Sequence, residues 1–199
     1  MNDIAKLPFV FDVSRTLKQL QQLDAQSWLA HYNTRDYEGN WNVLALRSGW
    51  GHPSNIYSVP LPAENYQDTP LLSLFPDVQR MLDELKCPKT SVRFMRLCAG
   101  AVIKEHTDDG LDATDAEARL HIPIQTHEQV EFYLNQQRVQ MRQGECWYLN
   151  FGKPHRVSNP SPADRIHLVI DCINNTWLRD LIEHAGNHTN QDTLNRSYI

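Results

Sequence analysis

Two histidines and one aspartate in this chain have the types and the spacing to bind a metal ion. His106 and Asp108 form an H-x-D pair, and His155 follows 47 positions after Asp108. Side chains at positions i and i+2 of a strand point to the same side, so His106 and Asp108 reach one ion if their segment is extended. Two imidazoles and one carboxylate on one face of an ion leave coordination positions open, which is typical of non-haem Fe(II) oxygenases.

The sequence around these three residues predicts a mostly β core. Short alternating runs separated by turns extend from residue 91 to residue 172, which is typical of a sandwich or barrel. Asn135-Gln136 and Gln143-Gly144 are turn dipeptides between runs. We expect strands at about 91–98, 101–106, 118–125, 129–134, 137–141, 146–150 and 165–172. His155 would close the run before it, and 157–162 would be a loop.

The N-terminal flank, up to about residue 90, reads as helix and loop. Apolar spacing predicts a helix over 14–30 with Ser14 as its cap, and a second helix over 71–86. Between them, residues 41–47 predict a strand. The stretch 48–69, rich in Gly, Pro, Ser and Asn, predicts a long loop.

A short helix is expected over 177–184, followed by a polar tail that we expect to be mobile. With 199 residues, the chain has the length of one domain with a sizeable core. We therefore predict a single domain over 1–199. It would comprise a flank over about 1–90, a core over about 91–172, and a C-terminal helix and tail over 173–199.

Composition excludes several classes of partner. The net charge is −5 and no basic run stands out, which argues against nucleic acid or an anionic membrane as a partner. No apolar stretch approaches the roughly 20 residues of a membrane-spanning helix. The chain shows no signal-peptide pattern, and its four cysteines form no C-x-x-C pair. We expect a cytoplasmic protein with free thiols.

Two of the predicted strands carry polar residues on one side only. In 118–125 and in 165–172, mostly apolar residues stand at even positions, and the polar residues of interest stand at odd ones. Solvent exposure of one face gives the same pattern as a polar barrel interior. The residues on the polar sides are Arg119, His121, Arg165, His167 and Asp171.

A polar interior next to a metal ion has a chemical use. 2-Oxoglutarate supplies two electrons to an Fe(II) oxygenase by decarboxylating to succinate, and its far carboxylate needs a cation. A guanidinium meets a carboxylate with two parallel hydrogen bonds. Arg165 is the candidate for this contact, while Arg119 and His121 are candidates for orienting the other end of the cosubstrate or the substrate.

Residues 92–172 resemble the aspartyl/asparaginyl β-hydroxylase family of Fe(II)/2-oxoglutarate dioxygenases. The resemblance implies a double-stranded β-helix fold, which is a jelly roll and cupin-like, here with flanking N-terminal helices. It is carried, in this order, by Arg-Leu-His-Ile-Pro-Ile at 119–124, Gly-Glu-Cys-Trp at 144–147, His-Arg-Val-Ser-Asn at 155–159 and Asp-Arg-Ile-His-Leu-Val-Ile-Asp-Cys at 164–172. Residues 41–48 are a weaker match.

The resemblance also implies roles for single residues. His106 and His155 would be iron ligands, Arg165 would hold the far carboxylate of 2-oxoglutarate, and Arg119 with His121 would line the cosubstrate or substrate end. The vertebrate peptidyl hydroxylases of the family carry glycine where this chain has Asp108. Its retention makes the chain similar to small bacterial members that hydroxylate free amino acids, among them proline hydroxylases.

We therefore expect an enzyme with Fe(II) and 2-oxoglutarate as cofactors. O₂ and a small-molecule or peptide substrate would be its partners, and the sequence carries no signal for an oligomeric state. The alternative is a cupin-type metal protein, an isomerase or a sensor, that does not use 2-oxoglutarate. A non-catalytic domain that has kept the fold is a third hypothesis. Arg47 and His52 are candidates for the mouth of the site, and the acidic segment 109–118 is a candidate lid.

Overall fold

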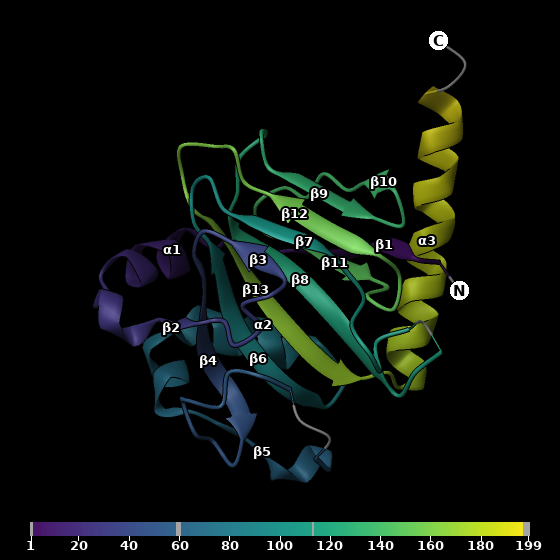
Figure 1. The fold of residues 1–199 in the computed structure, drawn as a ribbon. Coiled ribbons are helices and arrows are strands. Elements are labelled where there is room, and N and C mark those ends of the chain that lie inside the picture. Colours follow the sequence, from purple (N-terminus) through teal and green to yellow (C-terminus); the bar gives the residue numbers. More distant parts are fainter. Residues whose placement is uncertain (1, 59–60, 113, 197–199) are drawn as a thin grey trace.

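A computed structural model of the chain describes residues 2–58, 61–112 and 114–196, with side chains described through residue 186. Two antiparallel sheets face each other (Figure 1). The larger, eight-stranded sheet runs in the order β1 (Ile4–Val10), β11 (Glu145–Leu149), β8 (Glu117–Gln125), β13 (Arg165–Ile173), β6 (Lys89–Leu97), β4 (Trp41–Gly49) and β2 (Leu29–Ala30), and β5 (Tyr66–Asp68) pairs with β4. The smaller, five-stranded sheet runs in the order β10 (Gln137–Arg138), β9 (Glu131–Leu134), β12 (His155–Ser158), β7 (Val102–His106) and β3 (Tyr37–Glu38).

The even-numbered side chains of β8 and β13 face the outer, helix-covered side of the larger sheet. They are fully or almost fully buried in one apolar cluster with side chains from α1 (Ser14–Gln21), α2 (Pro76–Glu84) and α3 (Thr176–Arg196). Burying one such Leu or Ile contributes about 1.5–3 kcal/mol to folding. This burial fixes the register of both strands, because a slip by one residue would turn every apolar side chain to the other face. The members from the two strands are Leu120, Ile122, Ile124, Ile166, Leu168 and Ile170.

The odd-numbered side chains of the same strands therefore point toward the smaller sheet. β13 lies in the middle of the larger sheet, hydrogen-bonded to β8 on one side and to β6 on the other. Its register places Asp171 opposite Arg119 and Arg165 opposite Leu97. The polar residues that the alternation grouped together thus line the space between the sheets rather than an outer surface.

Both predicted N-terminal helices are shorter than expected. The first ends at Gln21, and a separate 3₁₀ turn, Ala25–Ser27, follows with Asp24 as its side-chain cap. Ser14 is not a cap, since it is the first helical residue and its own N–H donates to Asp12 Oδ1 at 2.9 Å.

The second predicted helix breaks before Pro76. A proline disfavours helical geometry in the residue before it, and Phe75 has φ −124° and ψ 69°. The segment is therefore a 3₁₀ helix, Pro70–Leu74, followed by α2. Within the predicted loop 48–69, residues 59–60 lie outside the described part, and the structure adds the 3₁₀ turn Ala63–Asn65 and β5.

The predicted core strands are confirmed with shifts at their ends, and five further strands were missed in the described part of the chain, namely β1, β2, β3, β5 and β12. β1 forms one edge of the larger sheet, where Pro8 costs little because a ladder hydrogen bond is not needed on the outer side. β12 begins at His155, so that residue opens a strand rather than closing one. The hairpin turn between β9 and β10 is confirmed, since Asn135 and Gln136 both have positive φ angles, 46° and 63°.

The C-terminal helix is longer than predicted, since α3 continues to Arg196 instead of ending at His184. Residues 197–199 of the predicted tail lie outside the described part. None of the helices in the described ranges is both long and apolar enough to cross a membrane. The four cysteines are free thiols, as expected. The division of the chain into a flank, a core and a C-terminal helix within one domain stays a prediction.

Candidate metal centre

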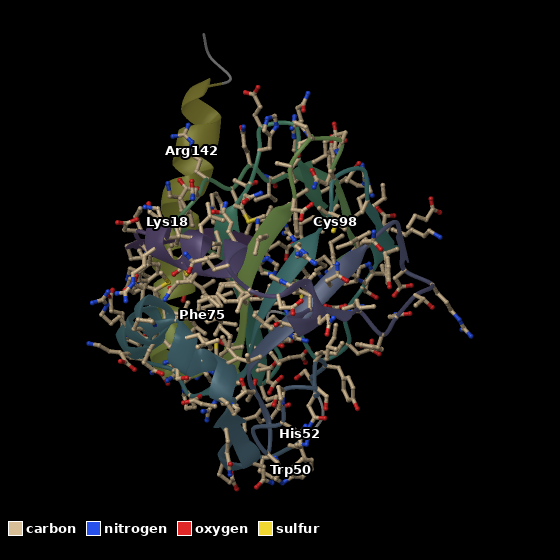
Figure 2. All side chains as sticks on the ribbon, turned by 90° about the vertical axis from the view of Figure 1, so that its left-hand side faces the viewer. Lys18, Trp50, His52, Phe75, Cys98 and Arg142 are labelled. Carbon is tan, nitrogen blue, oxygen red and sulfur yellow. The ribbon has the colours of Figure 1, made fainter. Side chains whose placement is uncertain are left out.

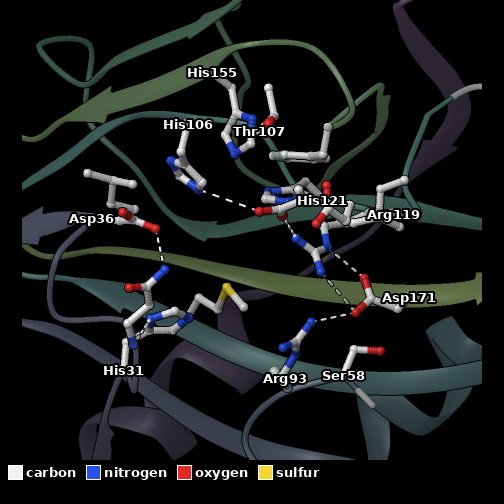
Figure 3. A pocket seen from close by; sticks show the side chains of 18 of the residues that line it. His31, Asp36, Ser58, Arg93, His106, Thr107, Arg119, His121, His155 and Asp171 are labelled. Carbon is white, nitrogen blue, oxygen red and sulfur yellow. Dashed lines mark hydrogen bonds and ion pairs between the residues drawn. The ribbon is translucent and has the colours of Figure 1, made fainter. Parts of the chain in front are cut away.

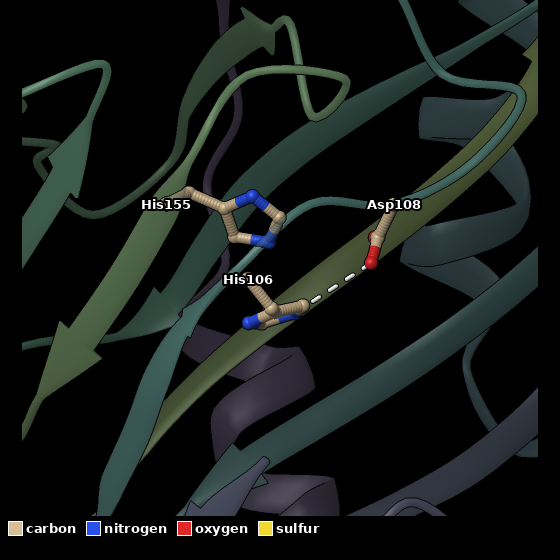
Figure 4. Close-up of side chains that lie close together, drawn as sticks. All are labelled: His106, Asp108 and His155. Atoms are coloured by element: carbon tan, nitrogen blue, oxygen red, sulfur yellow. Dashed lines mark ion pairs between the residues drawn. The ribbon is translucent and has the colours of Figure 1, made fainter.

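The smaller sheet brings His106, Asp108 and His155 together. β7 and β12 are antiparallel neighbours, and the register pairs His106, the last residue of β7, with His155, the first of β12. One potential ligand atom from each of the three residues lies within 4.8 Å of the other two (Figure 4). His106 Nε2 is 3.5 Å from Asp108 Oδ1. The spacing suits three donors around one ion.

The imidazole rings are held in the tautomer that a metal requires. His106 Nδ1 lies 2.8 Å from the carbonyl oxygen of Lys104, and His155 Nδ1 lies 3.1 Å from that of Lys153. A carbonyl oxygen only accepts, so each Nδ1 carries a proton, and in a neutral ring with this tautomer Nε2 has the free lone pair. Burial is the largest effect on His155 and lowers its pKa to about 4, so its ring is neutral near pH 7.

Asp108 is oriented by a guanidinium from the opposite sheet. Arg119 Nη1 on β8 donates to Asp108 Oδ2, while the other oxygen, Oδ1, faces His106. Burial raises the pKa of Asp108, but the charge of Arg119 and the neighbouring histidines outweigh this effect and lower it. The carboxylate is therefore ionised near pH 7, as a metal ligand must be.

A cavity of about 720 Å³ opens in front of these residues (Figure 3). Both sheets contribute to its wall, together with the loop after β2 and the segment between β7 and β8. The apolar part of the wall includes Trp41, Met95, Ile103, Phe132, Phe151 and Val157. The volume suits a small molecule or one side chain of a larger one.

Arg165 lies in the wall of this cavity without an anionic partner. Its side chain is 3% exposed, and no carboxylate in the described part of the chain forms an ion pair with it. One Nη donates to His167 Nδ1 at 2.9 Å, the guanidinium lies over the Phe132 ring at 5.8 Å, and Nε has no hydrogen-bond partner. Burial lowers the pKa of Arg165 to about 9. A buried cation without a counter-charge is costly, so this position favours an anionic ligand.

Sequence comparison gives the family of the chain. The family model for aspartyl/asparaginyl beta-hydroxylases matches residues 12–175. The chain belongs to this family. The resemblance noted from the sequence is thereby confirmed.

Among curated relatives of the family, the chain is similar to L-proline cis-4-hydroxylase of Rhizobium meliloti (strain 1021). The two are 27% identical over 166 residues, which cover 81% of this chain and 57% of the relative. The chain thus matches little more than half the length of that relative.

Solved structures with a similar fold include a Pseudomonas putida prolyl-4-hydroxylase, with a TM-score of 0.53 and 13% identity over 88% of this chain and 94% of the other. HygX from Streptomyces hygroscopicus, with nickel and 2-oxoglutarate bound, has a TM-score of 0.53 and 11% identity, over 87% of this chain and 84% of its own. The epimerase SnoN has a TM-score of 0.55 and 9% identity, over 90% of this chain and 85% of its own. At these identities the likeness concerns the fold, and it confirms the predicted jelly roll.

The other two residues singled out by resemblance to the family, Arg119 and His121, also line the cavity. His121 is stacked on Phe151 with ring centroids 5.0 Å apart, and its Nδ1 lies 3.1 Å from His167 Nδ1. Its Nε2 is buried without a hydrogen-bond partner. Arg119 is paired with Asp108 and Asp171. Their roles toward cosubstrate or substrate stay predictions.

Sequence reasoning missed His31, which lines the cavity, and the contacts of His167, which lies next to two lining residues. His31 is 7% exposed and stacks on Trp41 with ring centroids 3.6 Å apart, and its Nδ1 accepts a hydrogen bond from the Asn33 backbone N–H at 3.3 Å. His167 contacts both Arg165 and His121. Strand alternation placed His167 on the polar side, but nothing in the sequence near residue 31 points to the metal centre.

Arg47 and His52 are not at the mouth of the cavity. Arg47 donates to the carbonyl oxygens of Lys89 and Tyr66 and pairs with Asp68 at 2.7 Å, so it ties β4 to its neighbours. His52 is exposed at the far end of the molecule (Figure 2), where its Nδ1 lies 3.0 Å from Ser54 Oγ. These local contacts hold both side chains away from the cavity.

The segment 109–118 forms part of the cavity wall, with residue 113 outside the described part. Its Leu111 is 6% exposed, and the Leu111 carbonyl accepts a hydrogen bond from the Gly152 N–H at 3.1 Å. The predicted position over the site agrees with this placement, and the predicted motion of the segment stays a prediction.

Proposed function

We propose that this protein is an Fe(II)- and 2-oxoglutarate-dependent hydroxylase that acts on an amino acid or a related small substrate. The observation that carries the proposal is the presence, in one cavity, of the His106–Asp108–His155 group and Arg165, a buried guanidinium that forms no ion pair with the acidic residues described. Membership of the aspartyl/asparaginyl β-hydroxylase family supports the same activity.

The donor set fits the metal. Two imidazoles that each donate from Nδ1 to a backbone carbonyl, and one carboxylate beside them, are the donors of a non-haem Fe(II) site. In this proposal His106, Asp108 and His155 hold the ion. All three residues line the cavity, where cosubstrate and O₂ would bind.

When bound, iron and 2-oxoglutarate supply the electrons that activate O₂, and the cosubstrate loses CO₂ to become succinate. The protein's own residues would bind and orient the cosubstrate. Arg165 would hold the far carboxylate of the cosubstrate with two hydrogen bonds and would supply the charge that this carboxylate needs. His167, which accepts a hydrogen bond from Arg165, helps hold the guanidinium plane. Phe132 lies against Arg165 and Phe151 against His155, where their rings would exclude water from the bound cosubstrate.

The substrate class follows from the space that remains. The cavity also contains His31, Tyr32 and Trp41, which offer a flat aromatic wall next to the metal centre. The Rhizobium relative is, by its name, an enzyme of free proline, which supports a small amino-acid substrate here. The proposal includes a cytoplasmic location, where free amino acids are available as substrates.

A spectroscopic experiment tests the activity. Anaerobic addition of 2-oxoglutarate to the Fe(II)-loaded protein should produce a weak visible metal-to-ligand charge-transfer band. Addition of O₂ should then release succinate. A panel of free amino acids, followed by mass spectrometry for a gain of one oxygen atom, identifies the substrate. Absence of both the band and succinate rejects the proposal.

A further inference from the structure

A chain of charged side chains links the metal centre to the middle of the larger sheet (Figure 3). Asp171, on β13, is fully buried. It accepts two hydrogen bonds from Arg119, from Nε at 2.6 Å and from Nη2 at 3.2 Å. The remaining arm of the same guanidinium, Nη1, donates to Asp108. Asp171 therefore fixes the plane of the group that contacts a proposed metal ligand.

The contact selects one oxygen of Asp108. Arg119 occupies Oδ2, and Oδ1 is the oxygen that faces His106 Nε2 at 3.5 Å. A carboxylate held in this way presents a single oxygen to the ion. A freely rotating Asp108 would lose this preference and would also give up conformational freedom on binding the metal.

The charge balance adds a second effect. Arg93 Nη2 also donates to Asp171, at 2.5 Å, and its side chain is 2% exposed. One buried carboxylate thus serves two buried guanidiniums. Without the charge of Asp171, Arg93 and Arg119 would place uncompensated positive charge beside a divalent cation, and repulsion is strong where water is excluded.

We propose that Asp171 is a positioning residue for the metal ion, acting through Arg119 on Asp108. The inference rests on the proposed function to the extent that it takes His106, Asp108 and His155 as metal ligands. It adds a role for the larger sheet. Asp171 would orient the carboxylate ligand, Asp108, through Arg119, without itself contacting the ion.

The test compares Asp171→Asn with the unaltered protein and with Asp68→Asn. The amide in D171N keeps the shape of the carboxylate but not its charge. Asp68 also pairs with an arginine, at 2.7 Å, but outside the cavity, so D68N is a matched control. Titration with Mn(II) under calorimetry should show a Kd raised roughly ten- to a hundredfold in D171N and unchanged in D68N, the range typical of lost support behind a metal ligand. The visible spectrum of the Co(II)-loaded protein should change in D171N only.

A second variant keeps the proposal testable if D171N does not fold. Arg119→Lys keeps the positive charge, but a single ammonium cannot bridge Asp108 and Asp171 as the fork of a guanidinium does. It should weaken Mn(II) binding in the same range. If folded D171N or folded R119K binds Mn(II) with the Kd of the unaltered protein, the inference is overturned.

The outcomes separate this inference from the proposed function. An unaltered protein that binds Mn(II) but forms no succinate would reject the proposed reaction, and a raised Kd in D171N would still support the role of Asp171. Conversely, succinate formation with an unchanged Kd in D171N would reject only the role of Asp171. A protein that binds no Mn(II) at all would overturn both.

Discussion

Among the residues that the structure describes, Arg165 differs from the other buried arginines of the cavity in forming no ion pair with a carboxylate. Arg93 and Arg119 share Asp171, whereas Arg165 meets only a neutral ring nitrogen and the face of Phe132. Its charge is therefore available to an anionic ligand. Removal of this one side chain should remove the charge contact with the ligand.

Replacing Arg165 by Ala should raise the Kd for 2-oxoglutarate about ten- to a hundredfold, since a hydrogen bond to a charged group contributes about 1.5–3 kcal/mol. Calorimetry on the Mn(II)-loaded protein measures this change, and the Kd for Mn(II) should stay the same. Arg156→Gln is the control, because Arg156 lies over Tyr133 on the other side of β12 and outside the cavity. An R165A variant with full metal-dependent activity would instead favour a cupin-type protein that does not use 2-oxoglutarate.

A buried neutral histidine makes stability depend on pH. Burial and the nearby Arg93 lower the pKa of His31 to about 3. An unfolded histidine titrates near 6.5, so below that pH the unfolded state binds more protons, and acid lowers the free energy of unfolding. Replacing His31 by Gln in the metal-free protein should reduce this dependence by about 1.4 kcal/mol per pH unit between about pH 6 and pH 4.5.

Urea unfolding at several pH values measures this slope. His52→Gln is the control substitution, because His52 is exposed and lies outside the cavity. An H31Q variant with an unchanged slope would mean that His31 is protonated in the folded state.

Much of the candidate site could be predicted from residue types and spacing. The H-x-D pair and the alternation along two strands singled out His106, Asp108, Arg119 and Arg165. The resemblance to the family was needed to assign them to one site, because solvent exposure of one strand face gives the same alternation. Alternation says which face a side chain lies on, but not which group it meets across the cavity. The contacts that Asp171 makes, and the approach of His31 from far along the chain, depend on how the two sheets face each other.

At the scale of elements, the sequence predicted correctly those strands that have a strong local signal. The core strands were predictable because they alternate and are bounded by turn residues. β1 and β12 were not, because β1 contains Pro8 and β12 has only four residues, so neither offers a long pattern. The helix expected over 71–86 failed at Pro76, where the geometry required of the preceding residue outweighed the apolar spacing.

The turn before β11 gives a test at this scale. Gly144 has φ +79°, and a Cβ there would lie 2.2 Å from the carbonyl oxygen of Phe11, which is too close for two unbonded atoms. Gly144→Ala should therefore lower the free energy of unfolding by more than about 1 kcal/mol, measured by urea unfolding. Gly100→Ala is the control, since Gly100 has φ +76° but no atom within 4 Å of its would-be Cβ. Equal losses in both variants would mean that backbone strain alone is responsible.

For the molecule as a whole, the proposed ion lies where the two sheets meet. Two ligands come from strands of the smaller sheet, and the carboxylate is held from the larger one. A ligand that binds only the folded state stabilises it by about 2.7 kcal/mol at a hundredfold excess over its Kd.

Addition of Mn(II) should accordingly raise the Tm, and 2-oxoglutarate should raise it further only when the metal is present. Differential scanning fluorimetry measures both shifts, and excess EDTA should reverse them. In R165A the shift from the metal should remain and the shift from 2-oxoglutarate should be lost. A shift from 2-oxoglutarate in the metal-free protein would contradict binding through the ion.

One strand, β13, carries Arg165 at its start and Asp171 six positions later on the same face. At about 3.3 Å per residue, these two anchors stand roughly 20 Å apart. Inserting or deleting one residue between them would rotate one anchor out of the interior while the other stayed. The number of residues between these two positions of β13 therefore cannot change without loss of either the proposed cosubstrate contact or the proposed support of the metal ligand. The lengths of the loops are not constrained in this way.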